Sequence, residues 1–138
     1  SEDREGLTMK QPECRQEKFS RKGKILVARP KLGRSVPATA GYPNSARDGY
    51  PWAMQKWDPE IKKWRWTCLG IGDRERKSPE RMARDVLLYH SPGERMVWVK
   101  RWVAIGPRSK TRFFSAPKGG WRAVIDSRRI YEVAAAKP

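Results

Sequence analysis

The chain has 138 residues, a length typical of one domain, and its 31 Lys and Arg face only 15 Asp and Glu, a formal net charge of +16. No run approaches the roughly 20 apolar residues that span a bilayer, and the first ten residues lack the apolar core of a signal peptide. These features exclude a membrane-spanning helix and predict an intracellular protein of the cytoplasm, nucleus or nucleoid, without a membrane partner.

Two cysteines and one histidine offer little for metal or nucleophilic chemistry. Cys14 and Cys68 could pair with each other but are too few for a disulfide framework, and His90 has no partner ligands at metal-binding spacing. The acidic residues between 73 and 85 each have an arginine nearby, which favours helix ion pairs over the carboxylate cluster of a two-metal nuclease. We therefore expect no enzyme, no metal and no cofactor. A metal-free ribonuclease built on His90 is the catalytic alternative.

The N-terminal third of the chain is predicted to contain little regular structure. Residues 1–20 mix both charge signs without apolar periodicity, which predicts a mobile polar arm or at most a short helix. Residues 21–51 are basic and rich in proline and glycine, with one short β-type run over 25–27. A loop of that length is typical of a functional or disordered segment.

A Trp-rich hairpin is predicted next. Residues 52–57 and 63–69 have the composition of two strands, and Asp58-Pro59-Glu60 between them is typical of a tight turn. A side-chain period of two would place Trp64, Trp66 and Cys68 on one face of the second strand.

A helix and further strands are predicted after the hairpin. Ser78 as N-cap, Pro79 at the first helical position and apolar residues at helical spacing predict a helix that ends before Ser91-Pro92-Gly93. Residues 96–105 read as a long strand with Val97 and Val99 on one face and Trp98 and Trp102 on the other. Shorter strands are predicted over 112–114 and 121–125, and residues 128–133 as a strand or short helix.

Together the elements predict an α+β fold: a mainly antiparallel sheet with one inserted helix and a basic N-terminal arm. An open sheet and a small curled barrel are both compatible with this pattern. The expected organisation is a polar arm (1–20), a basic loop-rich segment (21–51), a globular α+β core (52–134) and a tail (135–138).

Positive charge gathers in three stretches that we expect to bind nucleic acid, because each Lys or Arg that neutralises a phosphate releases condensed counterions. The stretches are an N-terminal run (Arg21, Lys22, Lys24, Arg29, Lys31, Arg34), the hairpin (Lys56, Trp57, Lys62, Lys63, Arg65) and a C-terminal group (Lys100, Arg108, Lys110, Arg112, Lys118, Arg122).

Each stretch also has a structural interpretation. The N-terminal run could be a solvated segment or a localisation signal. The tryptophans of the hairpin could form the core, with Trp57 beside the turn the most exposed. The C-terminal group could protect a sheet edge from aggregation. Arg128 and Arg129 lie close enough to Asp126 and Glu132 to form intramolecular ion pairs instead of ligand contacts.

The predicted function is a nucleic-acid-binding module that contacts mainly the phosphate backbone of DNA or RNA, with limited sequence specificity. No helix-turn-helix, zinc finger or RNP-type motif is present to read bases directly. The alternative is a protein-interaction module, of the kind found among viral or mobile-element accessory proteins, in which a Trp-lined groove binds a peptide or an acidic partner. Accessible Trp amid Lys and Arg would favour nucleic acid, and an uncharged Trp patch would favour a protein partner.

Overall fold

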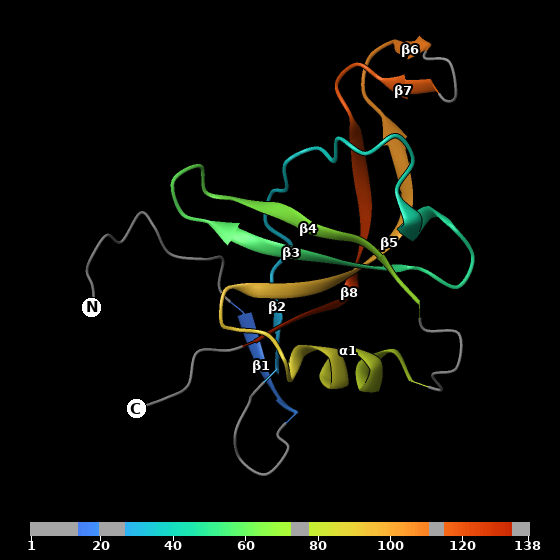
Figure 1. Ribbon diagram of the computed structural model, residues 1–138. Coiled ribbons are helices and arrows are strands. Elements are labelled where there is room, and N and C mark those ends of the chain that lie inside the picture. Colours follow the sequence, from blue (N-terminus) through green and yellow to red (C-terminus); the bar gives the residue numbers. More distant parts are fainter. Residues whose placement is uncertain (1–13, 20–26, 73–77, 111–114, 134–138) are drawn as a thin grey trace.

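The computed structural model describes residues 14–19, 27–72, 78–110 and 115–133 (Figure 1). Their elements, in chain order, are β1 (Cys14–Phe19), β2 (Val27–Pro30), the 3-10 turn η2 (Asn44–Ala46), β3 (Trp52–Asp58), β4 (Lys63–Ile71), α1 (Pro79–Leu87), β5 (Glu94–Ala104), β6 (Arg108–Lys110), β7 (Ser115–Pro117) and β8 (Trp121–Val133).

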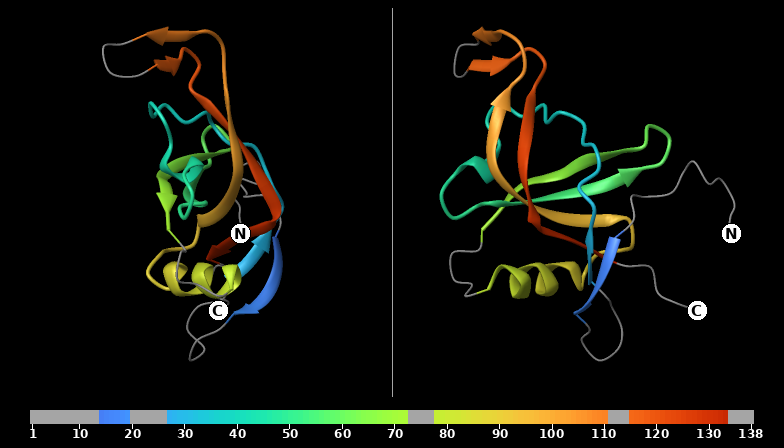
Figure 2. Two further views of the ribbon diagram at one scale, coloured as in Figure 1. Left: turned by 90° about the vertical axis from the view of Figure 1, so that its right-hand side faces the viewer. Right: turned by 180° about the vertical axis from the view of Figure 1, so that it is seen from behind.

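Six strands form one antiparallel sheet in the order β1-β2-β8-β5-β3-β4, and β6 and β7 form a separate two-stranded ribbon. The long strands β5 and β8 bend and extend to the ribbon, and α1 lies at the other end of the molecule (Figure 2). The expected antiparallel sheet with one helix is therefore confirmed, although the helical content is small. The sheet is open, so the alternative of a curled barrel is wrong: no ladder joins the outer strands β1 and β4 within the described ranges.

Residues 31–46, here called the crossing segment, run from β2 across the molecule to η2. Near its start, the Trp64 N–H of β4 donates to the Arg34 carbonyl and the Val36 N–H donates to the Trp64 carbonyl. Further along, Ala38 and Trp121 exchange two backbone hydrogen bonds at the beginning of β8. The segment thus contacts both β4 and β8 without closing the sheet, because each contact is an isolated bridge.

The N-terminal third contains more strand than predicted. Cys14–Phe19 forms β1 where a polar arm or helix was predicted. Val27–Pro30 forms β2, which shares only Val27 with the β-type run predicted over 25–27, since residues 25 and 26 lie outside the described residues. β2 pairs with β1 and with the end of β8, and pairing of that kind is invisible in the local pattern. The division of the chain at residues 20, 51 and 134 stays a prediction.

Residues 121–133 form one 13-residue strand, β8, instead of the two short elements predicted there. The register explains the apparent break. Val97 of β5 pairs with Ile130, but Val99 pairs with Ile125, so β8 bulges over residues 126–129. A bulge bends its strand, and this one lies where β8 turns in Figure 1. The strand predicted over 112–114 lies outside the described residues. The described strands on either side of it, β6 and β7, pair with each other in the ribbon.

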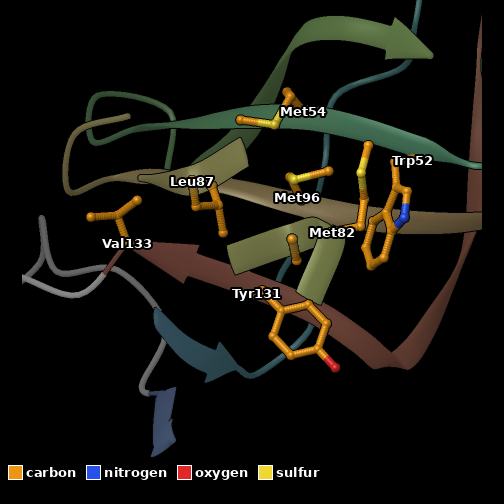
Figure 3. Close-up of a cluster of buried hydrophobic side chains, with 8 residues drawn as sticks. Trp52, Met54, Met82, Leu87, Met96, Tyr131 and Val133 are labelled. Atoms are coloured by element: carbon orange, nitrogen blue, oxygen red, sulfur yellow. The ribbon is translucent and has the colours of Figure 1, made fainter. Parts of the chain in front are cut away.

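Helix α1 is confirmed at the predicted position. Ser78 is in an extended conformation and its hydroxyl accepts a hydrogen bond from the Arg81 N–H, as an N-cap does, and Pro79 follows at the first helical position. Leu87, Met82 and Ala83 bury their side chains against β5 and β8 in a cluster with Met96, Tyr131 and other residues (Figure 3). Within the described ranges, no helix has the length and apolar character needed to cross a membrane.

The sheet has apolar residues on both faces. The cluster beneath the helix contains Trp52, Met96 and Tyr131, and the opposite cluster contains their chain neighbours Ala53, Val97 and Ile130. Alternation along the strands explains this division, because successive side chains point to opposite faces. The opposite face also carries a buried polar row, in which Gln55, Arg95 and Glu132 lie across from one another on β3, β5 and β8.

Two predicted face assignments are wrong, and β-bulges are the reason. In β4, Cys68 pairs with Met54 but Trp66 pairs with Gln55, so Thr67 is an extra residue. Cys68 accordingly packs against the cluster beneath the helix and Trp66 against the opposite one. In β5, Lys100 is the extra residue, and Trp102 packs with Val97 and Val99 instead of facing away from them.

Candidate functional site

A hollow of about 560 Å³ lies where the crossing segment meets β5 and β8. Its charged lining residues are Lys100, Arg101 and Arg108, and its aromatic ones are Tyr42, Trp102 and Trp121. The described lining contains no carboxylate. We call this feature the basic hollow. It combines positive charge with aromatic rings, as sites that hold phosphates and bases do.

The bulge in β5 explains how three consecutive residues reach one hollow. In a regular strand, Lys100 and Trp102 would share a face and Arg101 would point to the other. The extra residue at Lys100 breaks that alternation, so that Lys100, Arg101 and Trp102 all contribute to the lining. Lys100 and Arg101 are both exposed to solvent, and so is Arg108 at the start of β6.

The two indole rings of the hollow are held by hydrogen bonds to the crossing segment. The Trp102 Nε1–H donates to the Ser45 hydroxyl at 2.8 Å, and the Trp121 Nε1–H donates to the Gly41 carbonyl at 2.9 Å. Tyr42 and Trp121 make a T-shaped contact, with 5.7 Å between ring centroids and 69° between ring planes. The rings therefore form fixed walls, because their polar atoms and edges are already engaged.

The charges around the hollow are only partly balanced. The Arg108 guanidinium lies 5.1 Å from the centroid of the Trp121 ring, a cation–π contact. Lys100 acts on Asp126: burial opposes ionisation of that carboxyl, but hydrogen bonds from Arg128 and the positive charges of Arg128 and Lys100 lower its pKa overall. Asp126 also pairs with Arg128 at 3.4 Å and with Arg129 at 3.9 Å, as the sequence led us to expect.

Two further hollows open along the crossing segment. One, of about 330 Å³, lies between residues 32–36, β4 and β8, and includes Arg34, Lys63 and Arg122 beside the apolar Ala123 and Ile125. The other, of about 390 Å³, lies between residues 36–39 and β4 and includes Arg65. Neither has a carboxylate in its described lining.

The predicted site residues are thus divided among several places. Lys100 and Arg108 lie in the basic hollow, and Arg34, Lys63 and Arg122 share the second hollow. The remaining described cations are exposed outside these two hollows: Lys31, Lys56, Lys62, Arg65 and Lys118. Arg21, Lys22, Lys24 and Arg112 lie outside the described residues, and Arg29 and Lys110 are described only as backbone in β2 and β6.

Two residues of the predicted hairpin site make intramolecular contacts. Arg65 donates from Nε to the Asp58 carboxylate at 2.6 Å, and this hydrogen bond is the main reason why the pKa of Asp58 is lowered. Trp57 is half-buried instead of exposed, with its ring 5.4 Å from the buried Trp64. The hairpin therefore presents Lys56 and Lys62 to solvent, but its tryptophans pack internally.

Sequence reasoning missed Tyr42 and Trp121 as lining residues, whereas Arg101 and Trp102 belong to the Lys100-Arg101-Trp102 segment that the C-terminal basic group begins with. Tyr42 sits in a loop without a motif. The one usable signal was the density of positive charge from Lys100 to Arg122 with two tryptophans inside it.

Comparisons with protein-family models, with curated proteins and with solved structures found no match to this chain.

Proposed function

We propose that the chain is a nucleic-acid-binding module that contacts mainly the phosphate backbone, with limited sequence specificity, and that the basic hollow is the centre of the interface. The observation that carries the proposal is the grouping of Lys100, Arg101 and Arg108 with aromatic rings around one hollow whose described lining has no carboxylate. Phosphate oxygens are the natural partners of such a cation group, and a net charge of +16 attracts polyanions over long range.

The position of the accessible tryptophans also favours nucleic acid over a protein partner. Trp102 is partly accessible, and it stands between exposed cations and not in an uncharged patch. In the alternative, a peptide groove would be framed by α1 and the loop over residues 36–51. The three hollows described above lend it little support, because the described lining of each contains no residue of α1.

The proposal is tested by removing the same charge from two places. Lys100→Gln with Arg101→Gln removes two cations from the basic hollow, and Arg81→Gln with Arg128→Gln removes two exposed cations that lie outside it and are not among the predicted binding residues. Fluorescence anisotropy with labelled DNA and RNA oligonucleotides should show affinity weakened by about tenfold for the first pair and much less for the second.

Equal losses for the two pairs would mean that binding is spread over the whole basic surface and not centred on the hollow. Failure to bind any nucleic acid at low salt would overturn the function itself. Poly-glutamate serves as the control ligand: if it bound as tightly as DNA and RNA, the protein-interaction alternative would be preferred.

A further inference from the structure

We infer that the basic hollow receives an unpaired base, so that single-stranded nucleic acid is the preferred ligand of this chain. The inference rests on the proposed function and adds the class of nucleic acid. Its starting point is Tyr42, whose residue surface is 57% exposed although its ring lies at the wall of a hollow. An exposed aromatic ring beside cations is a surface on which a base can stack.

The neighbouring rings are less accessible than Tyr42. Trp121 is only 5% exposed and lies nearly perpendicular to Tyr42, so it supports the tyrosine ring but offers little surface of its own. Trp102 is packed against Trp66, with ring centroids 5.0 Å apart, and forms another wall. Tyr42 is therefore the stacking platform, and the two indoles keep the space beside it open.

The size and charge of the hollow suit a base with its flanking phosphates. Its volume of about 560 Å³ lies within the range of about 300–1,000 Å³ that is usual for pockets holding small organic groups. Lys100, Arg101 and Arg108 are exposed around it, where the phosphates on either side of an inserted base would lie. A base inside a duplex is covered on both faces by its neighbours and cannot stack on Tyr42 without being flipped out, which costs a few kcal/mol.

The same geometry explains why little sequence preference is expected. Both indole N–H groups of the hollow are already used, one by the Ser45 hydroxyl and one by the Gly41 carbonyl. They are not free to read the edge of a base. Stacking, in contrast, accepts any base, because every base has a flat π-face.

The test compares a single-stranded oligo-dT with a hairpin duplex of the same phosphate count, using the full chain and four variants. Wild type should bind the single strand more tightly. Tyr42→Ala should weaken single-strand binding by about tenfold, as expected for one lost base stack, and leave duplex binding unchanged. Tyr42→Phe should bind as wild type does. Tyr42→Leu keeps apolar bulk against Trp121 but has no flat ring, so it should resemble Tyr42→Ala.

Tyr89→Ala is the matched control, because Tyr89 is a surface tyrosine, 88% exposed, that is not part of the hollow. An oligonucleotide with one abasic position supplies a second readout. It should bind wild type more weakly than the complete strand does, whereas Tyr42→Ala should hardly distinguish the two.

The outcomes separate this inference from the proposed function. Binding that falls equally for single strand and duplex in Tyr42→Ala, or that is unchanged for both, overturns base insertion but leaves phosphate binding intact. An equal loss in Tyr89→Ala overturns it as well. If neither oligonucleotide binds wild type, the proposed function fails, and the inference fails with it.

Discussion

Arg95 is a fully buried cation in the middle of the sheet. Its Nε donates to the Gln55 Oε1 at 2.8 Å, its Nη1 donates to the Lys31 carbonyl at 3.4 Å, and its guanidinium lies 3.9 Å from the centroid of the Trp64 ring. Burial lowers the pKa of Arg95 to about 9, against the opposing effect of the Glu132 charge. The side chain is therefore still charged at neutral pH, and its partners must offset the cost of removing that charge from water.

We predict that Arg95→Met destabilises the fold by about 3–5 kcal/mol, because Glu132 would stay buried without the cation opposite it. The double variant Arg95→Met, Glu132→Gln should lose less unfolding free energy than the sum of the losses of the two single variants. Urea denaturation of the four proteins of this cycle measures the coupling. If the two losses were strictly additive, the charges of Arg95 and Glu132 would not interact. The cation–π contact with Trp64 would then be the main stabilising contact of Arg95.

Among the tryptophans, sequence reasoning located the core only in part. Trp98 packs against the cluster beneath α1, on the face opposite Val97 as predicted, but Trp66 belongs to the opposite cluster with Trp102. Trp52 and Trp64 are fully buried, and neither was distinguished from its neighbours by the pattern. In a chain with seven tryptophans, hydrophobicity indicates that a core exists, whereas the register between strands decides which ring enters it.

At the level of elements, the crossing segment depends on a close contact between Gly70 and η2. A Cβ placed on Gly70 would come within 2.7 Å of the backbone nitrogen of Ser45 and would also overlap Asn44. Because η2 holds Ser45 beneath the Trp102 indole, this glycine lets β4 approach the turn that shapes the basic hollow.

Gly70→Ala should therefore destabilise the fold by about 1–3 kcal/mol, the usual cost of forcing extra volume into a packed contact. It should also weaken nucleic-acid binding at temperatures where the protein is still folded, because η2 must shift away from β4. Thermal melting and anisotropy measure the two effects. The comparison variant is Ser45→Ala, which removes the hydrogen-bond acceptor of Trp102 without a clash. If a folded Gly70→Ala protein bound nucleic acid as tightly as wild type does, the position of η2 would not matter for the binding site.

For the molecule as a whole, we predict that nucleic-acid affinity falls steeply with salt, because the net charge is +16. With on the order of five phosphate contacts, the affinity should fall by about a hundredfold between low and physiological salt. Titrations across a salt series give the slope. The Lys100→Gln, Arg101→Gln variant should have a shallower slope than wild type, and a flat response in wild type would contradict an electrostatic interface.

Features that depend on neighbours in the sequence were predictable here. The N-cap at Ser78 with Pro79 after it defined the helix, and the turn at Asp58 joined two strands of the right composition. The net charge of +16 led us to expect a polyanionic ligand before any fold was known, and that ligand stays a prediction. These signals are local or additive, so they do not depend on how distant segments meet.

The basic hollow, the buried Arg95 and the open edge of the sheet were decided only by tertiary structure. The hollow joins Tyr42, Trp102 and Trp121 from three parts of the chain, and Lys100 and Arg101 both line it because Lys100 is an extra residue in β5. A bulge is defined by the register with the partner strand. The isolated bridge between Ala38 and Trp121 joins residues more than eighty positions apart in the chain. Such contacts leave no periodic trace in the sequence, because the residues that make them are selected by the fold around them and not by their immediate neighbours.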